Sequence, residues 1–365
     1  MKIYPNVLDR QFYMYQDEYE QKALQVLRKG WYVLGDEVKN FEEEFATYIG
    51  SKHCVGLANG LDALWISFRL LGIGRGDEVI VQSNAYIACV MGITINGATP
   101  VFVEPDEYHN IDIDKIEQVI TSKTKAILVV HLYGQASRMA KVRGICDRYN
   151  LYLVEDCAQS HGAMYDGRKT GTFGDVGCFS FYPSKNLGCF GDGGAIVTDN
   201  TELAQKFRVF RNYGSEKRYH NMMVGTNSRL DELQAGLLRV KLMHLDELNC
   251  ERAKIAERYL NEITNSCVTL PKVANLCTNI WHLFVITTDM REKLIKHLEA
   301  NGIYTMIHYP IPPHLSQAYE YLGYKAGAFP IAEQNAQKVL TLPLYNGMTE
   351  QEIDKVIEVV NGLGG

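Results

Sequence analysis

Two ionisable residues follow apolar runs of the sequence, at positions where a side chain can do chemistry. Asp156 ends LYLVED, and Lys185 lies in FSFYPSKNLGCFGDGG, between an apolar run and a glycine-rich turn. A charged group at the end of a buried strand needs a ligand or counter-ion, and burial lowers a lysine pKa toward the free amine. Pyridoxal phosphate (PLP) requires such an amine for its aldehyde and such a carboxylate for its pyridine nitrogen. The ordinary alternatives are a turn-capping aspartate and a solvated lysine.

Other residues could complete a site of this kind. Gly60 and Leu61 open a helix in ANGLDAL, where backbone N–H groups can bind a phosphate. Tyr86 could stack on a planar ring, and Ser180 could donate a hydroxyl to the phosphate. Each has a structural alternative: a plain helix cap, a core tyrosine and a strand serine bonded to backbone.

Two histidines stand apart from this set. His308 lies in HYPIPPH, a proline-rich segment typical of loops that contact substrates, whereas His161 could equally be structural. Motifs of other enzyme classes are missing, because the sequence has neither the HExxH of zinc proteases nor the GxSxG of hydrolases. GIGRG at 72–76 lies between a helix and a strand, so it is no dinucleotide fingerprint.

The elements that position these residues alternate between strand and helix. Helical spacing covers 16–29 and 36–49, and apolar runs then alternate with helical segments to about residue 198. This order predicts an α/β fold with a mostly parallel sheet, whose ligands collect at the carboxyl ends of the strands. We expect a large domain at 1–245 and a small C-terminal α+β domain at 246–365.

Composition narrows the class of protein. The 365 residues carry a formal charge of −6, which gives no electrostatic reason to expect nucleic acid or a membrane surface as partner. The nine cysteines include no CxxC pair, and we expect no metal site. The N-terminus lacks the apolar run of a signal peptide, and no stretch reaches about 20 apolar residues, so we expect a cytoplasmic protein.

Together the motifs resemble one enzyme family. NGLDAL, VEDCAQSHGA, FSFYPSKNLGCFGDGGAIVT and GTNSRLDELQAGLL occur here in the order found in the DegT/DnrJ/EryC1/StrS family of sugar aminotransferases. The resemblance implies PLP fold type I, as in aspartate aminotransferase. It also implies a ping-pong reaction in which glutamate donates the amino group and pyridoxamine phosphate (PMP) is the intermediate form of the cofactor. The enzyme would be a homodimer with its active site at the interface.

The resemblance also assigns roles to residues. Lys185 matches the catalytic lysine that binds PLP covalently, Asp156 the partner of the pyridine nitrogen and Gln159 the residue that bonds the ring hydroxyl. Asn227 matches a residue that reaches the phosphate in the neighbouring subunit. The remaining cofactor-binding matches are Ser180, Gly60, Leu61 and Tyr86, with leucine at 61 where many relatives have threonine.

The predicted substrate is a dTDP-linked 3-keto-6-deoxyhexose, aminated to the 3-amino-3,6-dideoxyhexose for a product such as lipopolysaccharide O-antigen. The GLDAL form and IHYPIPPHL resemble the branch with that specificity. His308, Tyr309 and Tyr219 are the candidate sugar and nucleotide contacts. Amination of a 4-keto sugar remains an alternative, and a non-catalytic sensor or scaffold is a remote one. A sugar dehydratase of this family would have histidine at position 185.

Overall fold

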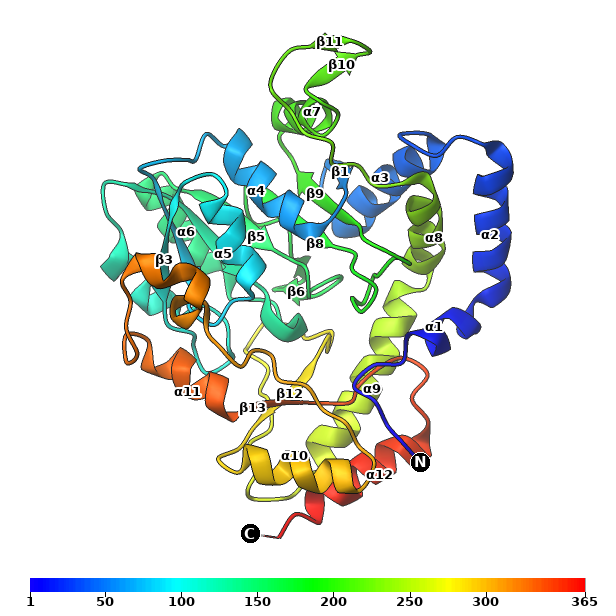
Figure 1. The fold of residues 1–365 in the computed structure, drawn as a ribbon, viewed down its shortest axis with the longest axis vertical. Coiled ribbons are helices and arrows are strands. Elements are labelled where there is room, and N and C mark those ends of the chain that lie inside the picture. The colour runs from blue at the N-terminus through cyan, green and yellow to red at the C-terminus, as the bar shows by residue number, and fades with distance from the viewer. Residues whose placement is uncertain (365) are drawn as a thin grey trace.

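The computed structural model describes residues 1–364. A seven-stranded sheet forms the centre of the large part of the molecule, which precedes the C-terminal elements in the chain. Figure 1 shows the C-terminal elements gathered below this part. The strand order is β1 (His53–Leu57), β9 (Gly194–Thr198), β8 (Val176–Ser180), β5 (Tyr152–Asp156), β4 (Thr124–Val130), β2 (Glu78–Gln82) and β3 (Thr99–Val103). β9 pairs antiparallel with β1 and β8, and every pair from β8 to β3 is parallel. The predicted mostly parallel sheet is confirmed.

Helices cover both faces of the sheet, because its strands are apolar on both sides. Three helices pack on one face with the strands in a shared core: α4 (Gly60–Leu70), α5 (Ile87–Thr94) and α7 (Thr201–Phe210). The other face is covered by α3 (Asp36–Ile49), α6 (Met139–Tyr149) and α8 (Glu232–Met243). The N-terminal helices α1 (Leu8–Met14) and α2 (Gln16–Lys29) precede them.

Two small hairpins extend from the large part. β6 (Met164–Tyr165) pairs with β7 (Arg168–Lys169), and β10 (Ser215–Lys217) pairs with β11 (His220–Asn221). The β10–β11 hairpin projects beyond α7 at the top of Figure 1. No helix within residues 1–364 is long and apolar enough to cross a membrane.

The C-terminal part has its own apolar core around an antiparallel strand pair. Its elements are α9 (Leu245–Glu262), β12 (Phe284–Thr287), α10 (Arg291–Ala300), α11 (Pro330–Lys338), β13 (Val339–Leu342) and α12 (Glu350–Asn361). The predicted domain boundary after residue 245 stays a prediction. The prediction assigned the N-terminal residues to the large domain, but Ile3 packs in the C-terminal core. Ile3 is fully buried in this C-terminal core and forms a parallel bridge with Ile303, because its apolar side chain finds cover there.

Candidate active site

A cavity of about 750 Å³ lies between the carboxyl ends of the central strands and the C-terminal part. Segments far apart in the sequence meet there: the ends of β5 and β8, the starts of α4 and α5, and residues 306–309. Most of the predicted site residues line it, namely Gly60, Leu61, Tyr86, Asp156, Gln159, Ser180, Lys185, His308 and Tyr309. The rule that ligands collect at strand ends therefore located the cavity.

Asp156 is held at the end of β5 by two hydrogen bonds. Its Oδ1 accepts the backbone N–H of Ala158 at 3.0 Å, and its Oδ2 accepts the thiol of Cys89 at 2.9 Å. Only 6% of the residue is exposed. Each carboxylate oxygen can accept a second hydrogen bond, so Asp156 can also receive a protonated ring nitrogen from the cavity.

Lys185 follows β8 in a turn that its own backbone N–H closes on the carbonyl of Tyr182 at 2.8 Å. The residue is half-buried and lines the cavity. Burial lowers the pKa of Lys185 to about 8, against the opposing attraction of Asp156. A fraction of its amine is therefore uncharged near neutral pH, as a nucleophile or general base requires.

The start of α4 approaches β8 and β9 more closely than a side chain would allow. A Cβ on Gly60 would lie 2.5 Å from Cβ of Ser180, and a Cβ on Gly194 would lie 2.4 Å from the carbonyl carbon of Asn59. Glycine at both positions lets the helix start lie against the serine. The GDGG turn thus has a steric role that its sequence alone did not reveal.

The same helix start presents N–H groups to the cavity. Asn59 caps α4 by accepting the N–H of Asp62 at 2.8 Å. Within residues 1–364, no protein acceptor binds the backbone N–H of Gly60 or Leu61. Unpaired N–H groups at a helix N-terminus beside a serine hydroxyl suit a phosphate.

Gln159 and two tyrosines form one wall of the cavity. Gln159 accepts the backbone N–H of Tyr133 at 2.7 Å and donates its amide to the hydroxyl of Tyr309 at 3.1 Å. The rings of Tyr86 and Tyr309 pack with centroids 5.0 Å apart, tilted by 35°. Burial raises the pKa of Tyr309, so its hydroxyl stays protonated.

The two histidines occupy different environments. His308 lines the cavity, with Nδ1 2.7 Å from Oγ1 of Thr341, and burial together with Lys185 lowers its pKa to about 4. His161 is fully buried against Phe179 and Phe181, and burial lowers its pKa to about 3. His308 can therefore meet a ligand as a neutral imidazole, whereas His161 has the structural environment of a core side chain.

Two predicted residues lie away from the cavity. Asn227 donates its amide to the hydroxyl of Tyr213 at 2.9 Å. Tyr219 is 82% exposed in the β10–β11 hairpin, with the guanidinium of Arg218 5.0 Å from its ring centroid. Neither lines the cavity of its own chain. Their predicted roles would require a second subunit and stay predictions.

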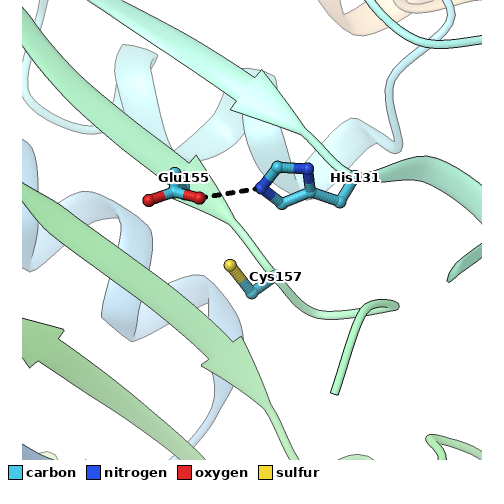
Figure 2. Close-up of side chains that lie close together, drawn as sticks. All are labelled: His131, Glu155 and Cys157. Carbon is cyan, nitrogen blue, oxygen red and sulfur yellow. Dashed lines mark hydrogen bonds and ion pairs between the residues drawn. The ribbon is translucent and has the colours of Figure 1, made fainter. Parts of the chain in front are cut away.

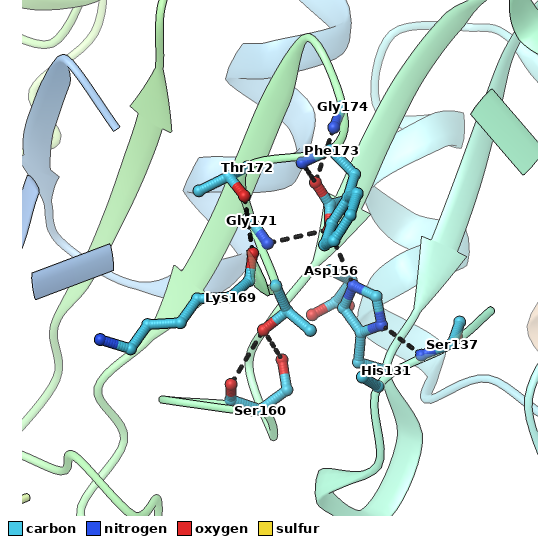
Figure 3. A network of polar contacts seen from close by, with 12 residues as sticks. His131, Ser137, Asp156, Ser160, Lys169, Gly171, Thr172, Phe173 and Gly174 are labelled. Atoms are coloured by element: carbon cyan, nitrogen blue, oxygen red, sulfur yellow. Dashed lines mark hydrogen bonds and ion pairs between the residues drawn. The ribbon is translucent and has the colours of Figure 1, made fainter. Parts of the chain in front are cut away.

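Beside the cavity, His131, Glu155 and Cys157 form a buried cluster with the residue types of a metal site (Figure 2). Figure 3 shows the polar network around this cluster, with His131, Ser137 and the backbone at Gly171, Phe173 and Gly174 drawn close together. Nε2 of His131 lies 3.0 Å from Glu155, and its Nδ1 accepts the N–H of Ser137. The other donors to Glu155 are the backbone N–H groups of Gly171, Phe173 and Gly174. The cluster therefore anchors the 171–174 loop, and its donor set does not fit a cation.

Cys89 and Tyr133 are contacts that sequence reasoning missed. Tyr133 follows β4 in VVHLYG, so the rule that placed Asp156 at a strand end could have found it. Cys89 lies inside an apolar helix, and no pattern distinguishes its thiol from that of a core cysteine.

Comparison with known proteins identifies the family of this chain. The model of the DegT/DnrJ/EryC1/StrS aminotransferase family matches residues 14–361. The chain belongs to this family. This membership confirms the predicted family and the prediction of an aminotransferase.

Individual relatives are similar over almost the whole chain. The dTDP-3-amino-3,6-dideoxy-alpha-D-galactopyranose transaminase of Aneurinibacillus thermoaerophilus is 52% identical, over 96% of each chain. The dTDP-3-amino-3,4,6-trideoxy-alpha-D-glucose transaminase of Streptomyces venezuelae is 47% identical, over 94% of this chain and 91% of its own.

Solved structures confirm the predicted fold class. The crystal structure of S. venezuelae DesV in complex with a ketimine intermediate superposes with a TM-score of 0.97 at 45% identity, covering 99% of this chain and 98% of its own. NtdA of Bacillus subtilis with bound PMP gives a TM-score of 0.90 at 32% identity, covering 97% of this chain and 83% of its own.

Proposed function

We propose that this aminotransferase moves an amino group from glutamate to a dTDP-linked 3-keto-6-deoxyhexose, giving the dTDP-3-amino-3,6-dideoxyhexose. The observation that carries the proposal is the convergence of Lys185, Asp156 and Gln159 on one cavity. The relative from A. thermoaerophilus, named for such a product, supports this choice of sugar.

The residues that line the cavity fit PLP. Asp156 would hold the pyridine nitrogen, Gln159 the ring oxygen, and Tyr86 one face of the ring. Ser180 and the N–H groups of Gly60 and Leu61 would hold the phosphate. When bound, the cofactor supplies an electron sink that stabilises negative charge at the carbon bearing the amino group.

Lys185 is the general acid and base of this proposal. Its pKa of about 8 lets Nζ hold a proton and release it near neutral pH. The turn closed on Tyr182 keeps Lys185 in the wall of the cavity that Asp156 and Gln159 also line, where a reacting carbon would lie. His308 and Tyr309 stand at the side formed by the C-terminal part and would contact the sugar.

A homodimer would complete the site. Asn227 and Tyr219 do not line the cavity of their own chain, and both lie in a region of exposed side chains. The surface also carries large exposed apolar residues, namely Trp31, Tyr32, Tyr182, Phe190, Met222 and Val224. Such residues gather at protein interfaces. We expect Asn227 to reach the phosphate of the cofactor bound in the partner subunit. We also expect the enzyme to be cytoplasmic and to act in deoxysugar biosynthesis, for example for O-antigen.

The experiment that tests the proposal separates carbon 3 from carbon 4. Purified protein with PLP and glutamate is given dTDP-4-keto-6-deoxyglucose, either alone or after a 3,4-ketoisomerase, and amino sugars are identified by NMR. A 3-amino product that requires the isomerase supports the proposal. A 4-amino product from the untreated sugar would replace it with the 4-aminotransferase. If neither the 3-amino nor the 4-amino product forms, and no 2-oxoglutarate is released, the result would favour a sensor or scaffold.

A further inference from the structure

Tyr133 connects the cofactor side of the cavity with the C-terminal part through all three of its polar groups. Its backbone N–H donates to Oε1 of Gln159 at 2.7 Å, and its hydroxyl donates to the carbonyl of His308. Its own carbonyl accepts the N–H of Leu283 at 3.2 Å. Tyr133 is 7% exposed, so it forms these contacts in the interior.

These contacts form a closed ring of interactions. Gln159 donates to the hydroxyl of Tyr309, and Tyr309 follows His308 directly in the chain. The ring therefore runs from Tyr133 through Gln159, Tyr309 and His308 back to the hydroxyl of Tyr133. Because Oε1 of Gln159 is occupied by Tyr133, the amide presents its N–H groups to Tyr309 and to the cavity.

The backbone of Tyr133 is held in an unfavourable conformation. Its φ of 61° lies in the left-handed region, where a bulky side chain is rare. Such a conformation persists only where surrounding contacts determine it, and it occurs often at functional sites. Burial raises the pKa of the Tyr133 hydroxyl, which therefore remains a donor to His308.

We propose that Tyr133 is a positioning residue that fixes His308 and Tyr309 for recognition of the sugar. This inference rests on the proposed function, in which His308 and Tyr309 contact the nucleotide sugar. Tyr133 itself bonds to His308 and Gln159, and it acts on the substrate through these residues. Loss of its hydroxyl frees the 308–309 segment while leaving the N–H bond to Gln159 in place.

Tyr133→Phe tests the proposal against a matched control. Tyr259→Phe also removes a buried hydroxyl that donates to a backbone carbonyl, that of Pro343 at 2.9 Å, in the C-terminal core. Tyr133→Phe should raise the KM for the nucleotide sugar about five- to tenfold, the size expected for one lost hydrogen bond. Tyr259→Phe should lower the Tm about as much as Tyr133→Phe does, because each variant loses one buried hydrogen bond, but it should leave the KM for the nucleotide sugar unchanged. An equal KM in wild type and Tyr133→Phe would overturn the inference.

A double-mutant cycle gives a second, independent test. Tyr309→Phe breaks the same ring at its bond to Gln159, so the KM effects of Tyr133→Phe and Tyr309→Phe should combine to less than their product. Titration calorimetry with the dTDP-amino sugar made by the wild type should show the same pattern in Kd. Fully multiplicative effects would refute the ring. A wild type that aminates no dTDP-sugar would instead defeat the proposed function.

Discussion

The thiol of Cys89 donates to Oδ2 of Asp156 over 2.9 Å, on a residue with no solvent exposure. Burial and the neighbouring carboxylate raise the pKa of Cys89 well above its usual value, so the thiol keeps its proton. The contact holds Oδ2 of Asp156, a residue that lines the cavity. A cysteine in an apolar helix thereby fixes the group that would protonate the cofactor ring.

Replacement of this thiol should weaken PLP binding. We expect Cys89→Ala to raise the Kd for PLP about tenfold, because a hydrogen bond to a charged group contributes about 1.5 kcal/mol or more. Cys89→Ser keeps a donor and should restore most of the affinity. Cys146→Ala is the control, since Cys146 is equally buried on α6 and makes no contact with Asp156. Fluorescence titration of the apoprotein measures all four Kd values, and equal losses in both alanine variants would contradict the role.

The Asp156→Asn variant should bind PLP and turn over slowly. An amide keeps the shape of the side chain and can still accept from Ala158, but it cannot stabilise a positive charge on the ring nitrogen. Loss of one such electrostatic contact costs about 2.7–4 kcal/mol in the transition state, or roughly 100- to 1000-fold in kcat. Single-turnover amination monitored by mass spectrometry would measure this loss. A variant within about threefold of the wild-type rate would show that Asp156 has another role.

Lys185 should control both turnover and the pH dependence of cofactor uptake. Its pKa is lowered to about 8, so the ammonium predominates below that pH and the reactive amine above it. The rate of covalent PLP attachment to the apoprotein should therefore increase as pH rises through about 8 and level off above it. Stopped-flow absorbance measures this rate. Lys185→Ala should abolish attachment and turnover while preserving the fold by circular dichroism. A rate that falls with rising pH would exclude the neutral amine as the reacting form.

Sequence patterns predicted those features of the site that depend on the ends of elements. Asp156 and Lys185 follow apolar strands, and Gly60 opens a helix, so their placement in one cavity follows from the topology of a parallel sheet. Helical spacing likewise gave 16–29 and 36–49, which are the observed bounds of α2 and α3.

What the sequence could not predict depends on contacts between distant segments. The bond from Cys89 to Asp156 spans 67 residues, and the bond from Tyr133 to His308 spans 175. Ile3 joins the C-terminal core in the same way, since its β-bridge partner Ile303 lies far from it in the sequence. Local spacing carries no information on such pairs, because tertiary packing alone brings them together.

Glu155 should be important for stability rather than for a metal. Its carboxylate accepts the N–H groups of Gly171, Phe173 and Gly174 and binds His131, all at 2.7–3.0 Å. In Glu155→Gln, the amide would turn a donor toward some of these N–H groups and leave them unsatisfied. We expect the free energy of unfolding to fall by about 3 kcal/mol, the cost of unsatisfied buried groups.

Urea denaturation of Glu155→Gln beside the wild type measures this difference. The conservative control is Glu202→Gln, whose carboxylate forms one exposed ion pair with Lys206 and should contribute little. Zinc added to the wild type or to Glu155→Gln should leave the Tm unchanged. In the wild type, the N–H donors of the 171–174 loop already fill the acceptor sites of Glu155. If zinc raised the Tm of the wild type but not of Glu155→Gln, the cluster would be a metal site, and the anchoring role would have to be abandoned.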